Sequence, residues 1–181
     1  MTTRPTLLRP DRFPSTTEAL GDLLADVVAD GNSLGFLDGL TRDEAAEWWR
    51  GRAPAVARGD LAVWAALDAT GRCLGTVSLA FAALPNGRHR AEVCKLMVHS
   101  AARGQGLGRT LLTTAELAAA ERGITLLVLD TEAGSPAERL YRGAGWQRAG
   151  SIPDYAADPA GVLRPTTLFY KHPQTRAGQA A

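Results

Sequence analysis

Apolar positions follow helical spacing in some parts of the chain and strand spacing in others, so the pattern predicts both kinds of element. Helical spacing, with apolar residues three and four apart, recurs in four segments: 15–29, 41–57, 107–123 and 136–143. Runs rich in β-branched and aromatic residues predict strands at 6–9, 61–67, 73–82, 91–98, 124–129 and 166–171, with another beginning at Trp146. The predicted fold class is therefore α/β, in the mixed α+β sense.

The connections between these elements predict a mixed sheet. Turn residues at 68–72 and 85–88 join three successive strands into an antiparallel meander. The next connection runs from strand 91–98 through helix 107–123 to strand 124–129, which implies one locally parallel pair. Residues 151–165, rich in Pro, Asp and Gly, predict a loop.

Three segments carry helix-start signals. Ser15 with Glu18 and Thr41 with Glu44 have capping-box spacing, and Ser135-Pro136-Ala137-Glu138 combines an N-cap serine with a proline at the first helical position. Of the paired Trp48 and Trp49, we expect at least one in the core, and either could line a substrate pocket.

Composition narrows the class of protein. A chain of 181 residues with a net charge of +1 fits one domain, predicted at 1–172, and argues against a general nucleic-acid or membrane-surface binder. The small polar tail, 173–181, is expected to be disordered. Cys73 and Cys94 lie in predicted strands as small buried residues, and no residue spacing suggests a metal site. Without a membrane span or signal sequence, we expect a cytoplasmic protein.

The glycine-rich segment Arg103-Gly104-Gln105-Gly106-Leu107-Gly108-Arg109 follows a strand and opens a helix. Glycines let backbone amides approach a ligand, and the unpaired N–H groups of a helix start attract phosphate. The spacing fits neither the dinucleotide fingerprint nor the P-loop. Alone, the segment could equally be a flexible turn.

The loop Arg103–Gly108 resembles the Gln/Arg-x-x-Gly-x-Gly/Ala motif of the GCN5-related N-acetyltransferase (GNAT) superfamily. Residues 137–146, Ala-Glu-Arg-Leu-Tyr-Arg-Gly-Ala-Gly-Trp, are similar to a second motif of that family, Ala-x-x-Leu/Phe-Tyr-x-x-x-Gly-Phe. The resemblance implies an acetyl-CoA-dependent N-acetyltransferase. It also implies a mixed, mostly antiparallel sheet of six to seven strands, with a central parallel pair and about four helices on both faces.

The resemblance also assigns the cofactor contacts. Backbone groups of Leu96, Met97 and Val98 would hold the pantetheine arm, and residues 103–109 the diphosphate. Strand parity puts Glu92, Leu96 and Val98 on one face, although a bulge would invert part of that assignment. The family often has a cofactor-binding asparagine where this chain has Gly134, and Ser135 could replace it.

Acetyl transfer to an amine needs a base for the amine and an acid for the leaving thiolate. By resemblance Tyr141 is the acid, although it could be a packed helix-end tyrosine. Glu92 is a candidate base by resemblance, because histone-acetylating members of the superfamily have a glutamate eleven residues before the loop, as Glu92 is before Arg103. Asp130, at the end of an apolar strand, is a second candidate base. Glu92 could instead be a solvated strand-end residue, and Asp130 a turn residue. The two acids could also share the role.

Residues 151–156 and 164–171 resemble those of the tabtoxin-resistance acetyltransferases, which favours a small-molecule acceptor such as an antibiotic or toxin. The alternatives are a protein N-terminal or lysine acetyltransferase with the same cofactor site, and a CoA-binding sensor without catalysis. The sequence does not decide between a monomer and a homodimer.

Overall fold

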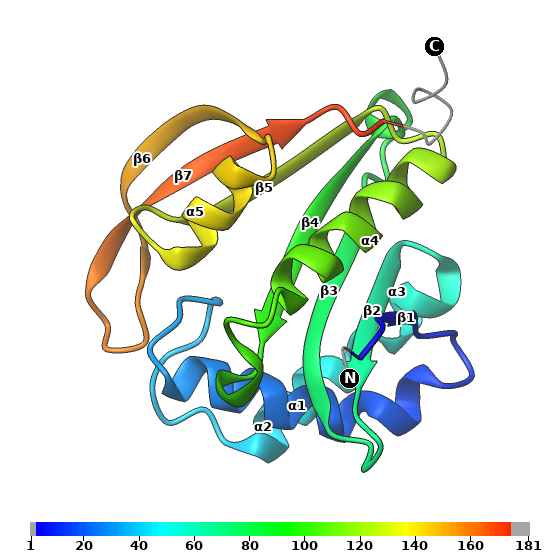
Figure 1. The fold of residues 1–181 in the computed structure, drawn as a ribbon, viewed down its shortest axis with the longest axis vertical. Helices are drawn as coiled ribbons and strands as arrows, with labels where there is room; N and C mark the ends of the chain where they lie inside the picture. The colour runs from blue at the N-terminus through cyan, green and yellow to red at the C-terminus, as the bar shows by residue number, and fades with distance from the viewer. Residues whose placement is uncertain (1–2, 175–181) are drawn as a thin grey trace.

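The computed structural model describes residues 3–174 and forms one seven-stranded sheet with helices on both faces (Figure 1). The strands are β1 Thr6–Leu7, β2 Leu61–Leu67, β3 Cys73–Phe81, β4 Arg90–Val98, β5 Leu126–Glu132, β6 Gln147–Ala157 and β7 Leu163–Lys171. The α-helices are α1 Phe13–Ala29, α2 Arg42–Arg50, α3 Ala53–Arg58, α4 Leu107–Glu121 and α5 Pro136–Gly143. The tail predicted to be disordered, apart from residues 173 and 174, lies outside the described residues.

The sheet has the predicted mixed topology. Its strand order is β1-β2-β3-β4-β5-β7-β6, and only β4 and β5 pair in parallel. Helix α4 makes the crossover between these two strands, and all other pairs are antiparallel. The fold class expected from the pattern is thus confirmed.

Each face of the sheet has its own hydrophobic core. One core lies under α4 and α5 and includes Leu111, Leu127, Tyr141 and Phe169. The other packs α1 and α2 against the opposite face of β2 and β3. The sheet therefore separates two layers of helices, as Figure 1 shows for α4 and α5 in front and α1 and α2 below.

Strand β4 contains a bulge that reverses the side-chain alternation. Cys94 pairs with Ser78 and Met97 with Thr76, so two β4 residues lie opposite Val77, and Lys95 has a left-handed φ of 50°. As a result Val93 joins the core under α4, whereas Met97, four residues on, joins the core under α1. Leu96 and Val98 therefore do not share a face with Glu92, contrary to simple strand parity.

Residues 151–165 are not the loop that their composition predicted. They form most of the β6–β7 hairpin, whose turn is closed by Asp158 Oδ1, which accepts a hydrogen bond from Val162 N at 2.9 Å. Pro153 and Asp154 lie where the β6–β7 register shifts, so the sheet tolerates the proline. Proline and glycine content alone could not distinguish this irregular hairpin from a loop.

Two helix predictions are corrected in detail. Helix α1 begins at Phe13, and the hydroxyl of Ser15 donates to the Arg12 carbonyl rather than forming the expected capping box with Glu18. The capping box at Thr41 and Glu44 is confirmed, but the helix that follows is broken at Gly51–Arg52 into α2 and α3.

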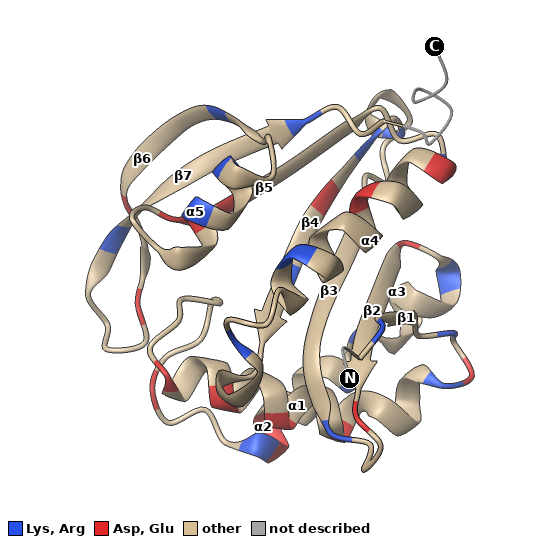
Figure 2. Ribbon diagram, viewed as in Figure 1, with Lys and Arg blue, Asp and Glu red and all other residues tan. Residues whose placement is uncertain are grey.

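Figure 2 shows acidic and basic residues interspersed along the ribbon. Among residues 3–174, none of the helices is both long and apolar enough to cross a bilayer, and no group of His, Cys, Asp and Glu side chains is arranged to hold a metal ion. The cytoplasmic location stays a prediction.

Candidate active site

The candidate site is centred on the divergence of β4 and β5, which we call the splay. The two strands pair only from Arg90 with Leu126 to Glu92 with Val128, and then separate. Beyond Glu92, the edge of β4 that faces β5 has no strand partner among residues 3–174, and this edge includes Leu96, Met97 and Val98. Free backbone groups there can pair with an extended ligand such as the pantetheine arm.

The glycine-rich loop lies at the start of α4. Gly104 and Gly106 have φ values of 74° and 79°, and a Cβ at either would meet no atom within 4 Å, so the loop is open to the outside. Gly106 is the N-cap of α4, and no side chain of the described residues caps the helix. In the described part of the chain, the amides of Leu107, Gly108 and Arg109 have no hydrogen-bond acceptor. This geometry fits a diphosphate.

The two arginines of the loop differ in their partners. Arg103 forms an ion pair with Asp30 at the end of α1 and donates from Nε to the Val98 carbonyl at 3.3 Å. Arg109 is exposed and forms no ion pair with residues 3–174. Arg109 is thus free to reach an anion, whereas Arg103 would have to leave Asp30 to do so.

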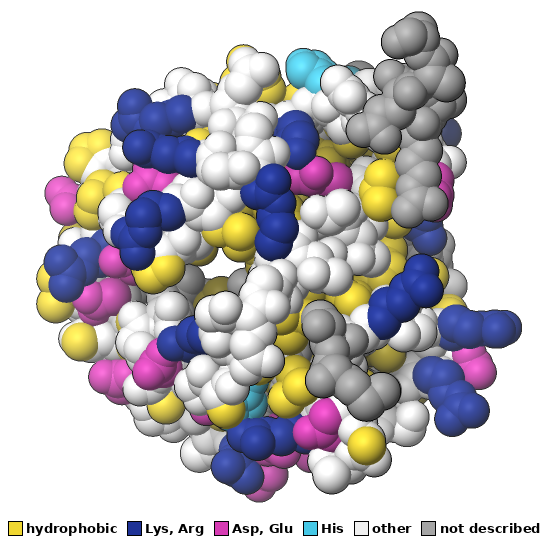
Figure 3. Space-filling model, viewed as in Figure 1, with side chains coloured by type: hydrophobic (Ala, Val, Ile, Leu, Met, Phe, Trp, Pro, Cys, Tyr) yellow, Lys and Arg dark blue, Asp and Glu magenta, His cyan; other side chains and the backbone are white. Residues whose placement is uncertain are grey.

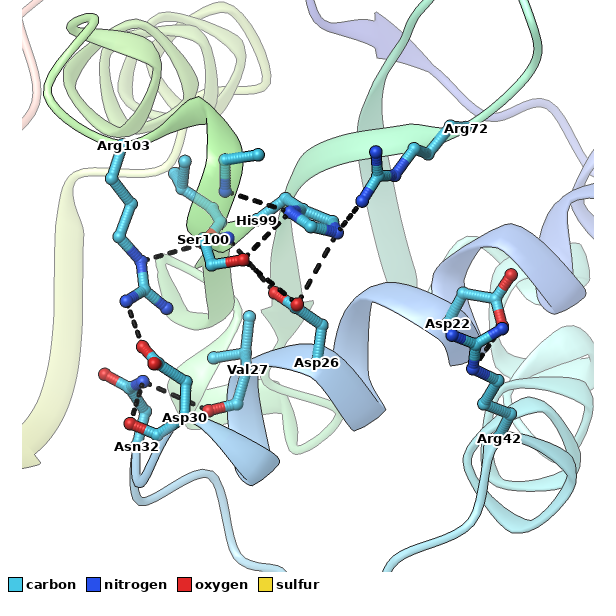
Figure 4. Close-up of polar contacts among 12 residues, drawn as sticks. Asp22, Asp26, Val27, Asp30, Asn32, Arg42, Arg72, His99, Ser100 and Arg103 are labelled. Carbon is cyan, nitrogen blue, oxygen red and sulfur yellow. Dashed lines mark hydrogen bonds and ion pairs between the residues drawn. The ribbon is translucent and has the colours of Figure 1, made fainter.

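Polar contacts fasten the end of α1 to the turn that precedes the loop (Figure 4). Asp26 accepts hydrogen bonds from the Ser100 backbone N at 3.0 Å and from the Ser100 hydroxyl at 3.1 Å. The buried His99 ring contacts Arg72 and accepts from Ala101 N at 3.1 Å. Asp26 could not be predicted from the sequence, since nothing in its own segment distinguishes it from any exposed helix aspartate.

Tyr141 lies on α5, with its ring packed against Trp146 and Phe169 at centroid distances of 5.9 and 6.1 Å. The side chain is buried, and its hydroxyl donates to no acceptor among the described residues. Burial raises the pKa of Tyr141, and the charge of Asp130 raises it further. The phenol therefore stays protonated at neutral pH, as a proton donor must.

Glu92 and Asp130 lie on the opposite face of the sheet from Tyr141, on the two strands that form the splay. Glu92 pairs with Val128, and Asp130 is two residues further along β5, so both side chains project from the same face. Burial and the charge of Asp130 raise the pKa of Glu92, although water still reaches the side chain. Asp130 accepts a hydrogen bond from the Thr166 hydroxyl at 3.3 Å and lies inside β5 rather than beyond its end.

Both cysteines are free thiols in strands, as predicted. Cys73 is buried, and burial raises its pKa to about 12. Cys94 is two residues from Glu92 on β4, where burial and then the charge of Glu92 raise its pKa to about 11. Because the thiolate is the nucleophile, a thiol protonated at neutral pH is poorly suited to carry an acetyl group.

Ser135 is the N-cap residue of α5. Its hydroxyl oxygen accepts from Glu138 N at 3.1 Å, and Glu138 in turn accepts from Gly134 N at 2.6 Å. The predicted helix start is confirmed. The suggested cofactor contact of Ser135 stays a prediction.

An aromatic and basic group, the acceptor-side cluster (Phe36, Trp48 and Lys95), flanks the same face as Glu92. Phe36 and Trp48 meet edge to face at 5.5 Å, and the Lys95 ammonium lies 5.7 and 5.2 Å from their ring centroids. Trp49 is instead fully buried against Phe13, so one of the paired tryptophans is in the core, as expected. Lys95 was not among the predicted site residues; its one signal in the sequence is that it is a lone cation in an apolar strand.

Two segments distant in the sequence meet beside this face. The Asp38 amide donates to the Pro159 carbonyl at 2.8 Å, and the Ser33 hydroxyl donates to the Ala157 carbonyl at 3.4 Å. The 31–40 loop is therefore held against the tip of the β6–β7 hairpin. Figure 3 shows a hollow in the surface next to this junction and to α5.

The mixed sheet with a splay, the uncapped glycine-bounded helix start and the buried tyrosine together fit an acyltransferase. Residues 24–146 match the Acetyltransferase (GNAT) family, and the chain belongs to this family. The family uses acetyl-CoA, and the free amides at the start of α4 fit its diphosphate.

Solved structures share the fold. A ribosomal-protein-alanine N-acetyltransferase from Brucella melitensis is 27% identical, with a TM-score of 0.70 over 88% of this chain and 95% of the other. The protein yncA of Salmonella typhimurium, solved with its cofactor acetyl-CoA, is 21% identical, with a TM-score of 0.71 over 98% and 99%. A candidate phosphinothricin N-acetyltransferase is 22% identical, with a TM-score of 0.74 over 94% and 99%.

Proposed function

We propose that this chain acetylates an amine of a small molecule, in a ternary complex with acetyl-CoA and by direct attack of the amine. The contact between the 31–40 loop and the β6–β7 hairpin, at Asp38 and Pro159, is the observation that most supports a small acceptor. The contact narrows the approach to the face that carries Glu92 and Asp130. An extended peptide would need this approach to be open.

In the proposed reaction, the residues act from both faces of the sheet. Glu92 or Asp130 takes a proton from the acceptor amine, directly or through water. Acetyl-CoA, when bound, supplies the thioester that the free amine attacks. The Tyr141 hydroxyl donates a proton to the departing sulfur; its raised pKa keeps the phenol protonated until then, and no acceptor among residues 3–174 competes for its hydrogen. The protonated thiol of Cys94 favours this direct transfer over an acetyl-cysteine intermediate.

In the proposed cofactor site, backbone groups at 96–98 bind the pantetheine arm and the amides of 104–109 bind the diphosphate, with Arg109 as the available cationic side chain. Arg103 would join them only after exchanging Asp30 for the diphosphate. The narrower likeness to tabtoxin-resistance acetyltransferases, and with it a role in antibiotic resistance, stays a prediction.

The test is a thiol-release assay with acetyl-CoA and two matched libraries, one of small amines and one of peptides. We expect turnover with small amines and little with peptides at equal amine concentration. Binding of acetyl-CoA by calorimetry without transfer to any compound would contradict the proposal and favour a CoA-binding sensor.

A protein N-terminal acetyltransferase is the second candidate, and one specific observation favours it. The Brucella melitensis protein, named for ribosomal-protein alanine, is 27% identical over most of both chains. In the same assay, turnover of Ala-initiated peptides above that of every small amine would select this alternative.

A further inference from the structure

Lys95 is a cation in an unusual position. It is half-buried on β4, three residues after Glu92, and its backbone has a left-handed φ of 50° in the strand bulge. For a residue other than glycine, such a conformation costs of order 1 kcal/mol or more, so the surroundings must hold it there. The bulge turns the Lys95 side chain toward Phe36 and Trp48, on the face that carries the two candidate bases.

The ammonium group of Lys95 has spare hydrogen-bonding capacity. Of its three N–H donors, one donates to the Leu34 carbonyl at 2.9 Å, and the aromatic faces of Phe36 and Trp48 supply weaker attraction. No carboxylate of residues 3–174 lies within 4.0 Å of it. Burial lowers the pKa of Lys95, as expected for a cation that is short of an anionic partner.

The position of Lys95 keeps it apart from the acids of the site. Glu92 and Asp130 are near enough for their charges to act on Lys95, yet neither forms an ion pair with it. The tether to Leu34 and the aromatic rings hold the ammonium away from them. Arg52, 4.5 Å above the Trp48 ring, adds a second positive charge on this side. The acceptor face thus presents separate acidic and basic ends.

We propose that Lys95 binds an anionic group of the acceptor, so that the acceptor is an amino acid or an amino-acid-like zwitterion whose amino group lies toward Glu92 and Asp130. The inference rests on the proposed small-molecule function and names its substrate class. A charge-assisted hydrogen bond to a carboxylate would use the free donors of Lys95. The competing explanation is that Lys95 only fixes the 31–40 loop through Leu34.

The experiment measures kcat/KM for matched pairs of acceptors, the L-amino acids and their carboxamides, by thiol release with saturating acetyl-CoA. We expect the wild-type protein to favour the acids by about tenfold or more, which is the scale of one charge-assisted hydrogen bond. The α-amine of an amino-acid carboxamide is less basic than that of the amino acid, so it is more often unprotonated. This difference alone would make the carboxamide react faster than the acid. A preference for the acid must therefore come from binding.

Variants test whether Lys95 is the source of the preference for acids over carboxamides. Lys95→Met should remove the preference for the acids through a higher KM for the acids, and Lys95→Arg should keep most of the preference. Arg42→Met removes the same charge from an exposed residue of α2 and should leave the ratio unchanged.

Three outcomes would contradict the inference about Lys95. Wild-type protein that acetylates amides or simple amines at least as well as the acids overturns the inference and leaves the N-acetyltransferase proposal intact. A preference that survives Lys95→Met shows that Lys95 does not bind the anion. Failure to acetylate any small amine, with acetyl-CoA bound, overturns the proposed function itself and this inference with it.

Discussion

The hydroxyl of Tyr141 can be removed with little other change to the protein. In Tyr141→Phe the ring keeps its contacts with Trp146 and Phe169, and the lost hydroxyl has no acceptor among residues 3–174. Removing a hydroxyl that has no protein partner leaves no other protein group unsatisfied, so we expect the free energy of unfolding to change by less than about 1 kcal/mol.

The expected effect on catalysis is much larger. Loss of a general acid lowers the rate by about 10²- to 10⁴-fold. At 1.36 kcal/mol for each factor of ten, this corresponds to about 2.7–5.4 kcal/mol of activation free energy. Because the raised pKa keeps the phenol protonated, the wild-type rate should not fall through ionisation of Tyr141 anywhere between pH 6 and 9.

Tyr170→Phe is the matched control. Its hydroxyl donates to Gln147 Oε1 at 2.6 Å on β6, so this variant loses a hydrogen bond that Tyr141→Phe does not. We expect the control to lose about 0.5–1.5 kcal/mol of stability at most and to keep its activity. The assay is kcat by thiol release at saturating substrates, with chemical denaturation of the same samples. If Tyr141→Phe kept kcat within twofold of the wild type, Tyr141 would not be the acid.

Three further predictions concern the base, the loop and the core. Burial and Asp130 raise the pKa of Glu92 above its usual 4.5, so kcat/KM should rise with pH as Glu92 loses its proton, and Asp130→Asn should shift that rise to lower pH. Glu92→Gln should abolish it and lower the rate about 10²-fold or more; an unchanged pH profile in Glu92→Gln would exclude Glu92 as the base. Gly106→Ala and Gly123→Ala, both at positive φ, should each cost about 1–2 kcal/mol of stability, but calorimetry should find weaker acetyl-CoA binding only for Gly106→Ala. Trp49→Ala should lower the free energy of unfolding by about 3–5 kcal/mol, and a loss below 1 kcal/mol would contradict its place in the core.

The sequence was most informative where one local segment determines both structure and chemistry. The glycine loop and the Ser135 helix start need only neighbouring residues, so the start of α4 and the position of Tyr141 on α5 followed from short patterns. The strands of the meander were also predicted, because their apolar runs are bounded by clear turns.

The acceptor side was not predictable in the same way. The bulge at Lys95 appears only when the β3–β4 register is known, and it reverses the faces that strand parity assigned. The contact of Ser33 with Ala157 joins residues 124 positions apart, and no local pattern encodes it. Both strands of the β6–β7 hairpin were predicted to be shorter than they are, because Pro153 and Asp154 interrupt the alternation.

The central claim is that the open amides at the start of α4 bind the diphosphate of acetyl-CoA and direct its sulfur toward Tyr141. A crystal structure of the protein with acetyl-CoA tests this most directly. The account predicts diphosphate oxygens about 3 Å from the amides of Leu107, Gly108 or Arg109, with the sulfur within hydrogen-bond reach of the Tyr141 hydroxyl. A diphosphate bound elsewhere, or a sulfur far from that hydroxyl, would contradict it.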